Sequence, residues 1–436
     1  MTHQTSAPQL QRKLGVPGAV MMGLGSIIGT GVFVSIGIAA GIAGPAVILA
    51  VAMAALVAIC NGLNSAQLAA NHAVSGGTYE YGYKFLTPWL GFTAGWMFLV
   101  AKTASAATAA LGFASYLLNA IGAERNLTVP TALVAVILFT LIVLGGIQRS
   151  NLANIAIVSL TLFSLGFFVI AGLPVVAAAG LSNFTPFFPA PNAESGSPVE
   201  AVLHASALMF VAYTGYGRIA TLGEEVQEPR KTIPKAIVVT MVLTMLLYIT
   251  VAIVSVGSVG SAGLSVATGV KAAPLELAAR RFGIPGSAQI LTIGAIAAML
   301  GVLLNLILGL SRVLLAMGRR RDMPGVVARL NRTGTTPYWA VIVVGIAIAG
   351  LVLTGNVKTT WSFSAFTVLI YYAITNLAAL RLPAEGRLYP KWLAWLGLAA
   401  CLFLAFWVEQ QIWSTGLGLI IAGLIWHTVA QRLVTN

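Results

Sequence analysis

The segment Gly25-Ser26-Ile27-Ile28-Gly29-Thr30-Gly31-Val32-Phe33 lies in the middle of the first long apolar stretch of the chain. Each glycine inside a helix costs about 1 kcal/mol relative to alanine. This cluster of glycines therefore predicts that the helix unwinds locally, and unwound backbone is tolerated at mid-membrane depth only where it lines a cavity. The spacing Gly25-x-x-x-Gly29 is also typical of closely packed helix pairs, so packing is the alternative for this segment alone.

A second interruption of the same kind occurs at Phe210-Val211-Ala212-Tyr213-Thr214-Gly215-Tyr216-Gly217-Arg218, again inside an apolar stretch. Paired glycine breaks in corresponding helices of two halves indicate the binding site of a transporter. A broken helix offers free N–H groups to a carboxylate and free carbonyls to an ammonium group. No strand precedes the glycines and no Gly-Lys-Ser/Thr follows them, so a nucleotide-binding loop is excluded.

The composition places the chain in a membrane. Of 436 residues, 58% are hydrophobic and only 8% are charged, whereas soluble domains have about 25% charged residues. The net charge of +13 comes from Lys and Arg in short segments between the apolar stretches. This arrangement follows the positive-inside rule and argues against nucleic-acid binding. The two cysteines, Cys60 and Cys401, lie inside apolar stretches, and no residue spacing indicates a metal site or a cofactor.

A membrane-spanning helix needs about 20 mainly apolar residues. The sequence predicts an all-α integral membrane protein with about twelve transmembrane helices and a single domain over 1–436. The predicted spans are 17–42, 45–70, 88–120, 129–147, 151–179, 199–222, 233–258, 284–316, 337–355, 359–381, 391–408 and 411–431. Placing both termini in the cytoplasm puts sixteen Lys and Arg inside and five outside, which predicts a cell-membrane protein with a cytoplasmic tail at 1–16.

Several segments resemble the amino acid–polyamine–organocation superfamily. They are GSIIGTGVF, Ser75-Gly76-Gly77-Thr78-Tyr79, FVAYTGYGRIATLGEEVQEPRKTIPKAI (210–237) and SRVLLAMGRRRDMP (311–324). The resemblance implies the LeuT-type fold, in which helices 1 and 6 are broken. It implies a five-plus-five inverted repeat with halves at 17–179 and 199–381, followed by two additional helices at 391–431.

The resemblance also implies a substrate site. The α-carboxylate is expected near the backbone N–H groups of Thr30 and Gly31 and near the Thr30 hydroxyl, and Gly29 is a further candidate substrate-binding residue. The α-ammonium is expected near the carbonyls of Ile27, Phe210 and Tyr213. Thr214 and Gly215 are expected to border the side-chain pocket, and Phe210 is either a gating aromatic or a packing residue.

The charged residues narrow the substrate. All eleven acids lie in loops or near the ends of spans, so no buried carboxylate would offset a cationic substrate. We therefore expect small neutral amino acids, with acidic amino acids or other small amines as the alternative. Lys102 lies well inside the third span, where a lysine costs about 2.5 to 3.5 kcal/mol. It is a candidate for coupling or proton movement, or alternatively a lysine that reaches the interface.

Other coupling and gating candidates come from the resemblance and from position. Relatives with a lysine in the fifth span have it near the position of Thr161 here. Sodium-coupled relatives use hydroxyls in the eighth span, and 295–310 contains none, so we expect sodium-independent transport. Arg218, Glu80 and Glu224 are candidates for an inner gate of ion pairs, with ordinary interfacial salt bridges as the alternative.

These observations predict a secondary carrier that works by alternating access, coupled to protons or to exchange. We expect no enzymatic activity, because no convergent nucleophiles, acids or metal ligands share one depth. A membrane-embedded enzyme or a sensor is the alternative from another class. The expected partners are an amino acid substrate and the lipid bilayer, without an obligatory protein partner.

Overall fold

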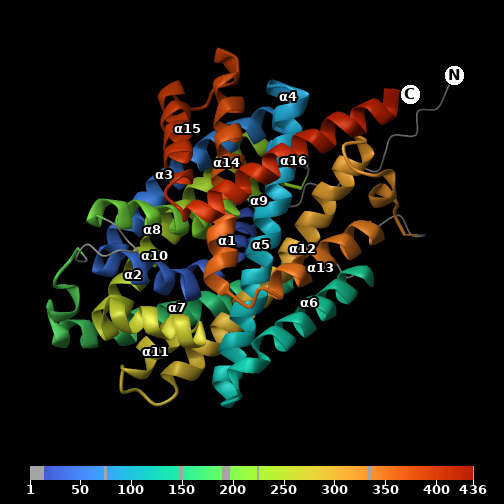
Figure 1. The fold of residues 1–436 in the computed structure, drawn as a ribbon. Coiled ribbons are helices and arrows are strands. Elements are labelled where there is room, and N and C mark those ends of the chain that lie inside the picture. Colours follow the sequence, from blue (N-terminus) through green and yellow to red (C-terminus); the bar gives the residue numbers. More distant parts are fainter. Residues whose placement is uncertain are drawn as a thin grey trace.

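Apolar stretches of the sequence form long helices in the computed structural model, which describes residues 14–72, 76–146, 151–188, 197–222, 225–331 and 336–435 (Figure 1). Residues 1–13, most of the expected N-terminal tail, lie outside these ranges. Within the described ranges the only β-type pairing is a bridge between Leu14 and Val226. This bridge holds the start of the first helix, Val16–Ile27, against the segment that precedes the helix Pro229–Lys271.

The helices are α1 (Val16–Ile27), α2 (Ile36–Ala43), α3 (Val47–Asn71), α4 (Thr78–Phe85), α5 (Pro88–Ile121), α6 (Thr128–Leu144), α7 (Asn151–Ala179), α8 (Pro198–Tyr213), α9 (Gly217–Ala220), α10 (Pro229–Lys271), α11 (Pro274–Arg280), α12 (Ser287–Arg319), α13 (Tyr338–Val352), α14 (Val357–Leu380), α15 (Lys391–Ala405) and α16 (Gln410–Thr435). Every predicted span contains a helix. The short helices α4 and α11 were not predicted.

In the described part of the chain, eight helical stretches are long and apolar enough to cross a membrane. Large apolar side chains lie exposed along the outer faces of several helices, among them Val134, Ile137, Leu138 and Leu141 on α6 and Val239, Val242, Leu243 and Leu246 on α10. In water such a surface would be unfavourable, whereas lipid solvates it. The protein is therefore a multi-pass membrane protein; the count of twelve spans stays a prediction.

The first predicted span is broken, as the glycines indicate. Helix α1 ends at Ile27, the chain is extended at Ile28, and helical geometry resumes as a wide π-helical turn, η1 (Gly31–Ser35), that leads into α2. The sixth predicted span is interrupted as well. Helix α8 passes at Tyr213 into a tighter turn, η5 (Thr214–Tyr216), and then into the short helix α9.

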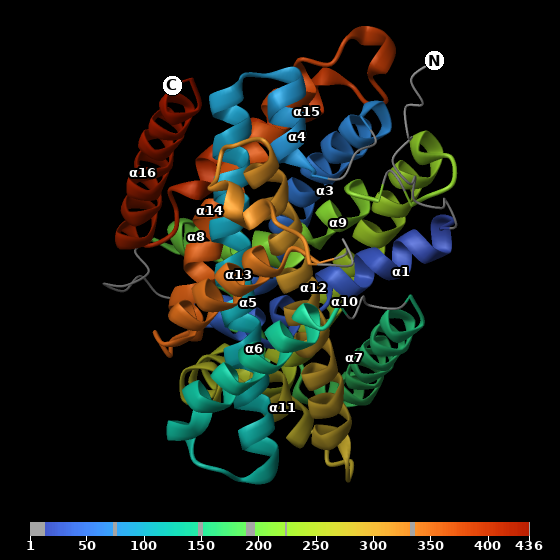
Figure 2. The same ribbon diagram turned by 90° about the vertical axis from the view of Figure 1, so that its right-hand side faces the viewer.

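The long helices pack into one bundle with two distinct ends. Helix α5 lies between α12 and α14, and α3 packs against α8 and α10 (Figure 1). Helix α4 and the last turn of α16 lie at the top of Figure 2, which we call the α4 end. Helix α11 and the turn between α5 and α6 lie at the opposite end, the α11 end.

The seventh predicted span, 233–258, is shorter than the helix that forms. Helix α10 continues to Lys271, with a kink at Gly260, whose φ is 71°. A glycine adopts this left-handed backbone without the steric cost that a Cβ would add. The kink therefore divides α10 into the predicted span and an additional helical segment that reaches the α11 end.

Candidate functional site

The two helix breaks meet face to face in the interior. A Cβ added to Gly31 would lie 2.7 Å from the Cα of Ala212, and one added to Gly215 would overlap the carbonyl of Ser26. Real Cβ atoms do not approach backbone this closely, so only glycine fits at either position. The glycines thus allow the broken backbone of α1–η1 and of α8–η5 to touch.

A small cavity of about 40 Å³ lies where the two breaks meet. It is lined by Ser26, Ile27, Thr30, Gly31, Lys102, Ser105, Val211, Ala212, Thr214, Gly215, Val302, Leu306 and Trp361. This volume admits water-sized molecules. An amino acid would require the surrounding side chains to move apart, so the structure represents a closed form of the site.

Lys102 and Thr30 give the cavity its polar character. The ammonium group of Lys102 on α5 donates a hydrogen bond of 2.9 Å to the Thr214 hydroxyl in the second break. The Thr30 hydroxyl is buried and has no hydrogen-bond partner among the described residues. The cavity wall contains no carboxylate. The site is therefore rich in donors and suited to a carboxylate or another acceptor group.

Tyrosine hydroxyls already occupy two carbonyls of the breaks. Tyr248 on α10 donates to the carbonyl of Ile27 at 3.0 Å and lies 3.4 Å from that of Ala212. Tyr372 on α14 donates to the carbonyl of Thr214 at 3.0 Å. These tyrosines were not singled out from the sequence, because aromatic residues in apolar helices give no signal of where their hydroxyls point.

Three predicted site residues lie outside the cavity lining. Phe210 is fully buried and packs edge to face on Tyr372, with ring centroids 5.7 Å apart. Tyr213 directs its hydroxyl to the carbonyl of Val51 on α3, at 3.3 Å. Gly29 faces Val302, whose methyl would lie 2.6 Å from an added Cβ.

Those coupling and gating candidates that the structure describes do not form one cluster. The Thr161 hydroxyl donates to the carbonyl of Ile157 in its own helix, at 2.8 Å. Arg218 on α9 contacts the Thr221 hydroxyl at 3.3 Å. Glu224 lies outside the described residues. Glu80 forms its ion pair with Arg320, at 2.7 Å, rather than with Arg218.

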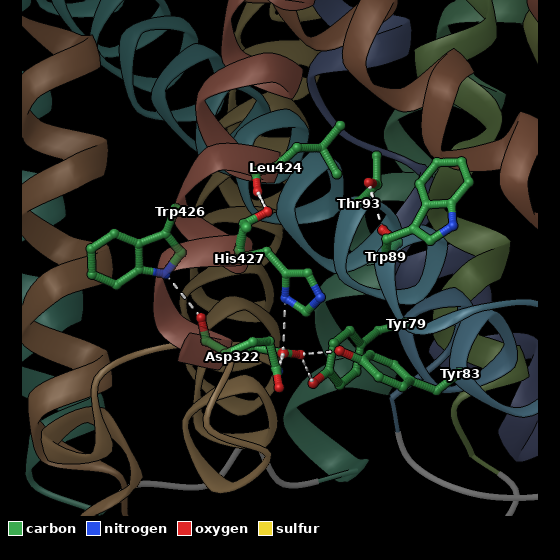
Figure 3. A network of polar contacts seen from close by, with 10 residues as sticks. Tyr79, Tyr83, Trp89, Thr93, Asp322, Leu424, Trp426 and His427 are labelled. Atoms are coloured by element: carbon green, nitrogen blue, oxygen red, sulfur yellow. Dashed lines mark hydrogen bonds and ion pairs between the residues drawn. The ribbon is translucent and has the colours of Figure 1, made fainter. Parts of the chain in front are cut away.

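A second polar cluster closes the α4 end around Asp322, whose side chain is fully buried. Figure 3 shows Tyr79 and Tyr83 of α4 reaching one carboxylate oxygen, each at 2.7 Å, while His427 of α16 lies 3.3 Å from the other. Burial and the hydrogen bond to Asp322 raise the pKa of both tyrosine hydroxyls, so they stay protonated donors. We call Tyr79, Tyr83, Asp322 and His427 the Asp322 cluster.

The Asp322 cluster joins three elements that are distant in sequence. Arg320 stacks over the Tyr83 ring, 4.1 Å from its centroid, and pairs with Glu80, so α4 is also held to the end of α12 from the outer side. The sequence suggested only that Asp322 lies near the end of a span. It gave no signal that this carboxylate is buried.

The α11 end is hollowed by a cavity of about 1520 Å³. Charged residues on its wall include Glu276, Arg280 and Glu409. The carboxylate of Glu409 lies 3.5 Å from both His204 on α8 and Lys358 on α14. Burial raises the pKa of Glu409, but the neighbouring His204 and Lys358 side chains outweigh this effect and lower it to about 2. Glu409 therefore stays ionised and links α8 to α14 at this cavity.

The described fold is that of a multi-pass membrane protein, and comparison with known proteins shows that it is a transporter. The model of the amino acid permease family matches residues 18–430, so the chain belongs to this family, within the amino acid–polyamine–organocation superfamily.

Relatives that match most of the chain carry different names. An uncharacterized transporter of Mycobacterium tuberculosis is 38% identical over 98% of this chain and 93% of its own length. The methylthioribose transporter of Bacillus subtilis is 29% identical, over 85% of this chain and 82% of its own. The branched-chain amino acid permease BcaP of Bacillus subtilis is 28% identical, over 76% and 72%.

Proposed function

We propose that this protein is a secondary carrier of small neutral L-amino acids that works by alternating access without sodium. The observation that carries the proposal is the meeting of two broken helices at one polar cavity, with the Thr30 hydroxyl unpaired and the breaks in glycine contact. Half-helix termini at such a point suit the carboxylate of a zwitterion. One relative is named a branched-chain amino acid permease, and branched-chain amino acids are neutral.

The wider layout belongs to the same proposal. It comprises twelve transmembrane helices, an inverted repeat of 17–179 and 199–381, and both termini on the cytoplasmic side of the cell membrane. The two helix breaks support the repeat, because they open the predicted halves at corresponding points. In this orientation the Asp322 cluster closes the cytoplasmic side and the larger cavity opens outward.

The test is counterflow in proteoliposomes with the purified protein and a panel of radiolabelled amino acids. Accumulation of neutral amino acids at equal rates in sodium and choline buffers is expected. Thr30→Val removes the unpaired hydroxyl and keeps the side-chain volume, so it should weaken substrate binding at least tenfold, about 1.4 kcal/mol. A panel in which no amino acid accumulates would contradict the proposal.

Acidic amino acids or other small amines are the second candidate, and Lys102 is the observation that favours the acidic ones. Its ammonium group lines the cavity, and no acid on the wall balances it. If a substrate side-chain carboxylate binds there, Lys102→Gln should abolish uptake of that substrate and spare neutral ones. If Lys102 instead couples proton movement, Lys102→Gln should remove the pH dependence of neutral amino acid uptake.

A further inference from the structure

Two asparagine side chains donate to carbonyls of α1, one to a carbonyl in its last turn and one to a carbonyl a turn earlier. The Asn154 amide on α7 donates to the carbonyl of Met21 at 3.0 Å. The Asn305 amide on α12 donates to the carbonyl of Gly25 at 3.3 Å. Both asparagines stand in largely apolar helices, where a polar side chain is costly unless it makes such bonds.

The packing around Gly25 shows that this contact is close and specific. Asn154 is only 1% exposed, and an added Cβ on Gly25 would overlap its side-chain oxygen. That oxygen, Oδ1, has no hydrogen-bond partner among the described residues. The amide nitrogen must face the Met21 carbonyl, because the reverse orientation would bring two acceptors together.

The Asn305 amide lies at the end of α1 that carries the negative charge of the helix dipole. The last carbonyls of a helix lack intrahelical partners and form the negative end of its dipole. In carriers with broken helices, such half-helix ends and unwound carbonyls coordinate the coupling cation. Gly25 lies in the last turn of α1, and its carbonyl receives a neutral N–H donor.

We infer that Asn305, bonded to the last turn of α1, and Asn154, bonded one turn earlier, form a neutral amide cap that takes the place of a coupling cation there. The amide cap holds α1 to α7 and α12 without an ion, so the carrier cycle needs no bound metal cation at this point. This inference rests on the proposed carrier function and gives a structural reason for sodium independence. Both asparagines act as positioning residues, because they act on the site through α1.

The amide cap is tested by reversing one donor. Asn305→Asp replaces the N–H donor with an acceptor of the same size, so the Gly25 carbonyl, the new carboxylate and the free Asn154 oxygen form a set of oxygens. Such a set repels itself unless a small cation enters. The matched control is Asn71→Asp, because the Asn71 amide also donates to backbone carbonyls, those of Gln67 and Gly386, away from α1.

The measurement is the thermal unfolding midpoint of the full chain in detergent, in sodium chloride and in choline chloride at equal ionic strength. The wild type should unfold at the same temperature in both salts. Asn305→Asp should unfold earlier in choline and regain about 2 °C or more in sodium. Asn71→Asp should show no difference between the salts. Asn154→Asp offers the same reversal on α7 if Asn305→Asp is not recovered folded.

A wild type stabilised by sodium would overturn the inference, because a cation would then hold α1. A variant that is equally stable to the wild type, or equally destabilised in both salts, would overturn it too. These readings need no substrate. Failure of the wild type to transport any amino acid would therefore contradict the proposed function and leave the thermal result to decide on the amide cap.

Discussion

At Gly215, a single added methyl group would clash with the backbone of the other helix break. Its Cα lies against the Ser26 carbonyl, which is backbone and cannot rotate away. Gly215→Ala should separate the two helix breaks and cost about 1 to 3 kcal/mol through overpacking. Counterflow should fall at least tenfold, with the protein still folded and extractable.

The matched control for Gly215→Ala is Gly309→Ala on α12. Nothing lies within 4 Å of a Cβ added at Gly309, and alanine favours the helix by about 1 kcal/mol. This variant should transport at the wild-type rate with equal or higher thermal stability. Equal transport by both variants would show that contact between the breaks is not required.

Sequence reasoning picked out several residues that line the cavity, because glycine clusters and a lysine inside an apolar helix are energetically costly and stand out in the sequence. Thr30, Gly31, Lys102, Thr214 and Gly215 were predicted, and all line the cavity. Side-chain direction was not visible: the Phe210 side chain packs on Tyr372 and the Tyr213 hydroxyl points to Val51, while the role expected of their backbone carbonyls stays a prediction. Asn154 and Asn305 were detectable in principle as polar residues in apolar helices.

Two contacts hold helix α4 in place: the buried carboxylate of Asp322 and the partly exposed ion pair between Glu80 and Arg320. Asp322→Asn should remove a charged acceptor from two tyrosine hydroxyls and lower the free energy of unfolding by about 2 kcal/mol or more. Glu80→Gln breaks the partly exposed pair with Arg320 and should cost at most about 1 kcal/mol. Thermal unfolding of both variants measures the difference; a larger effect of Glu80→Gln would contradict the importance of the buried cluster.

The link between α8 and α14 through Glu409 should depend on pH. Its pKa in the folded protein is about 2, below the ordinary 4.5, so the ionised form is stabilised by folding. The contribution is fully present above about pH 4.5 and is lost as the pH falls toward 2. The thermal unfolding midpoint of the wild type should therefore fall more steeply between pH 5 and pH 3 than the midpoint of Glu409→Gln. Parallel curves would count against the link.

The order of helices was predictable from hydrophobic stretches, because each apolar segment must bury its backbone polar groups in a helix. The contact of α4 and α16 through Asp322 was not predictable from the sequence. Asp322 and its partners Tyr79 and His427 are separated by long stretches of chain. The kink at Gly260 was missed because one glycine does not distinguish a bend from a straight helix.

The cavity at the α11 end is far larger than the cavity between the helix breaks, and labelling can measure the difference in access. Both native cysteines are buried and free, so wild-type protein should react slowly with a hydrophilic maleimide. Ser265→Cys places a thiol on the wall of the 1520 Å³ cavity and should react at least tenfold faster than Ser105→Cys, at the closed site. Equal rates would mean that the closed form is not the main one in solution. Added substrate should change the Ser105→Cys rate if the site opens to admit it.

The bridge at Leu14 carries a mechanical consequence. Leu14 accepts a backbone hydrogen bond from Gln227 and donates one to Glu225. The residues just before α1 are therefore joined to the segment just before α10. A tilt of α1 must therefore pull on α10, and Tyr248 of α10 holds the Ile27 carbonyl at the other end of α1. Because α1 is attached near both of its ends to α10 or to the segment just before it, we expect the two helices to move together as one rigid unit.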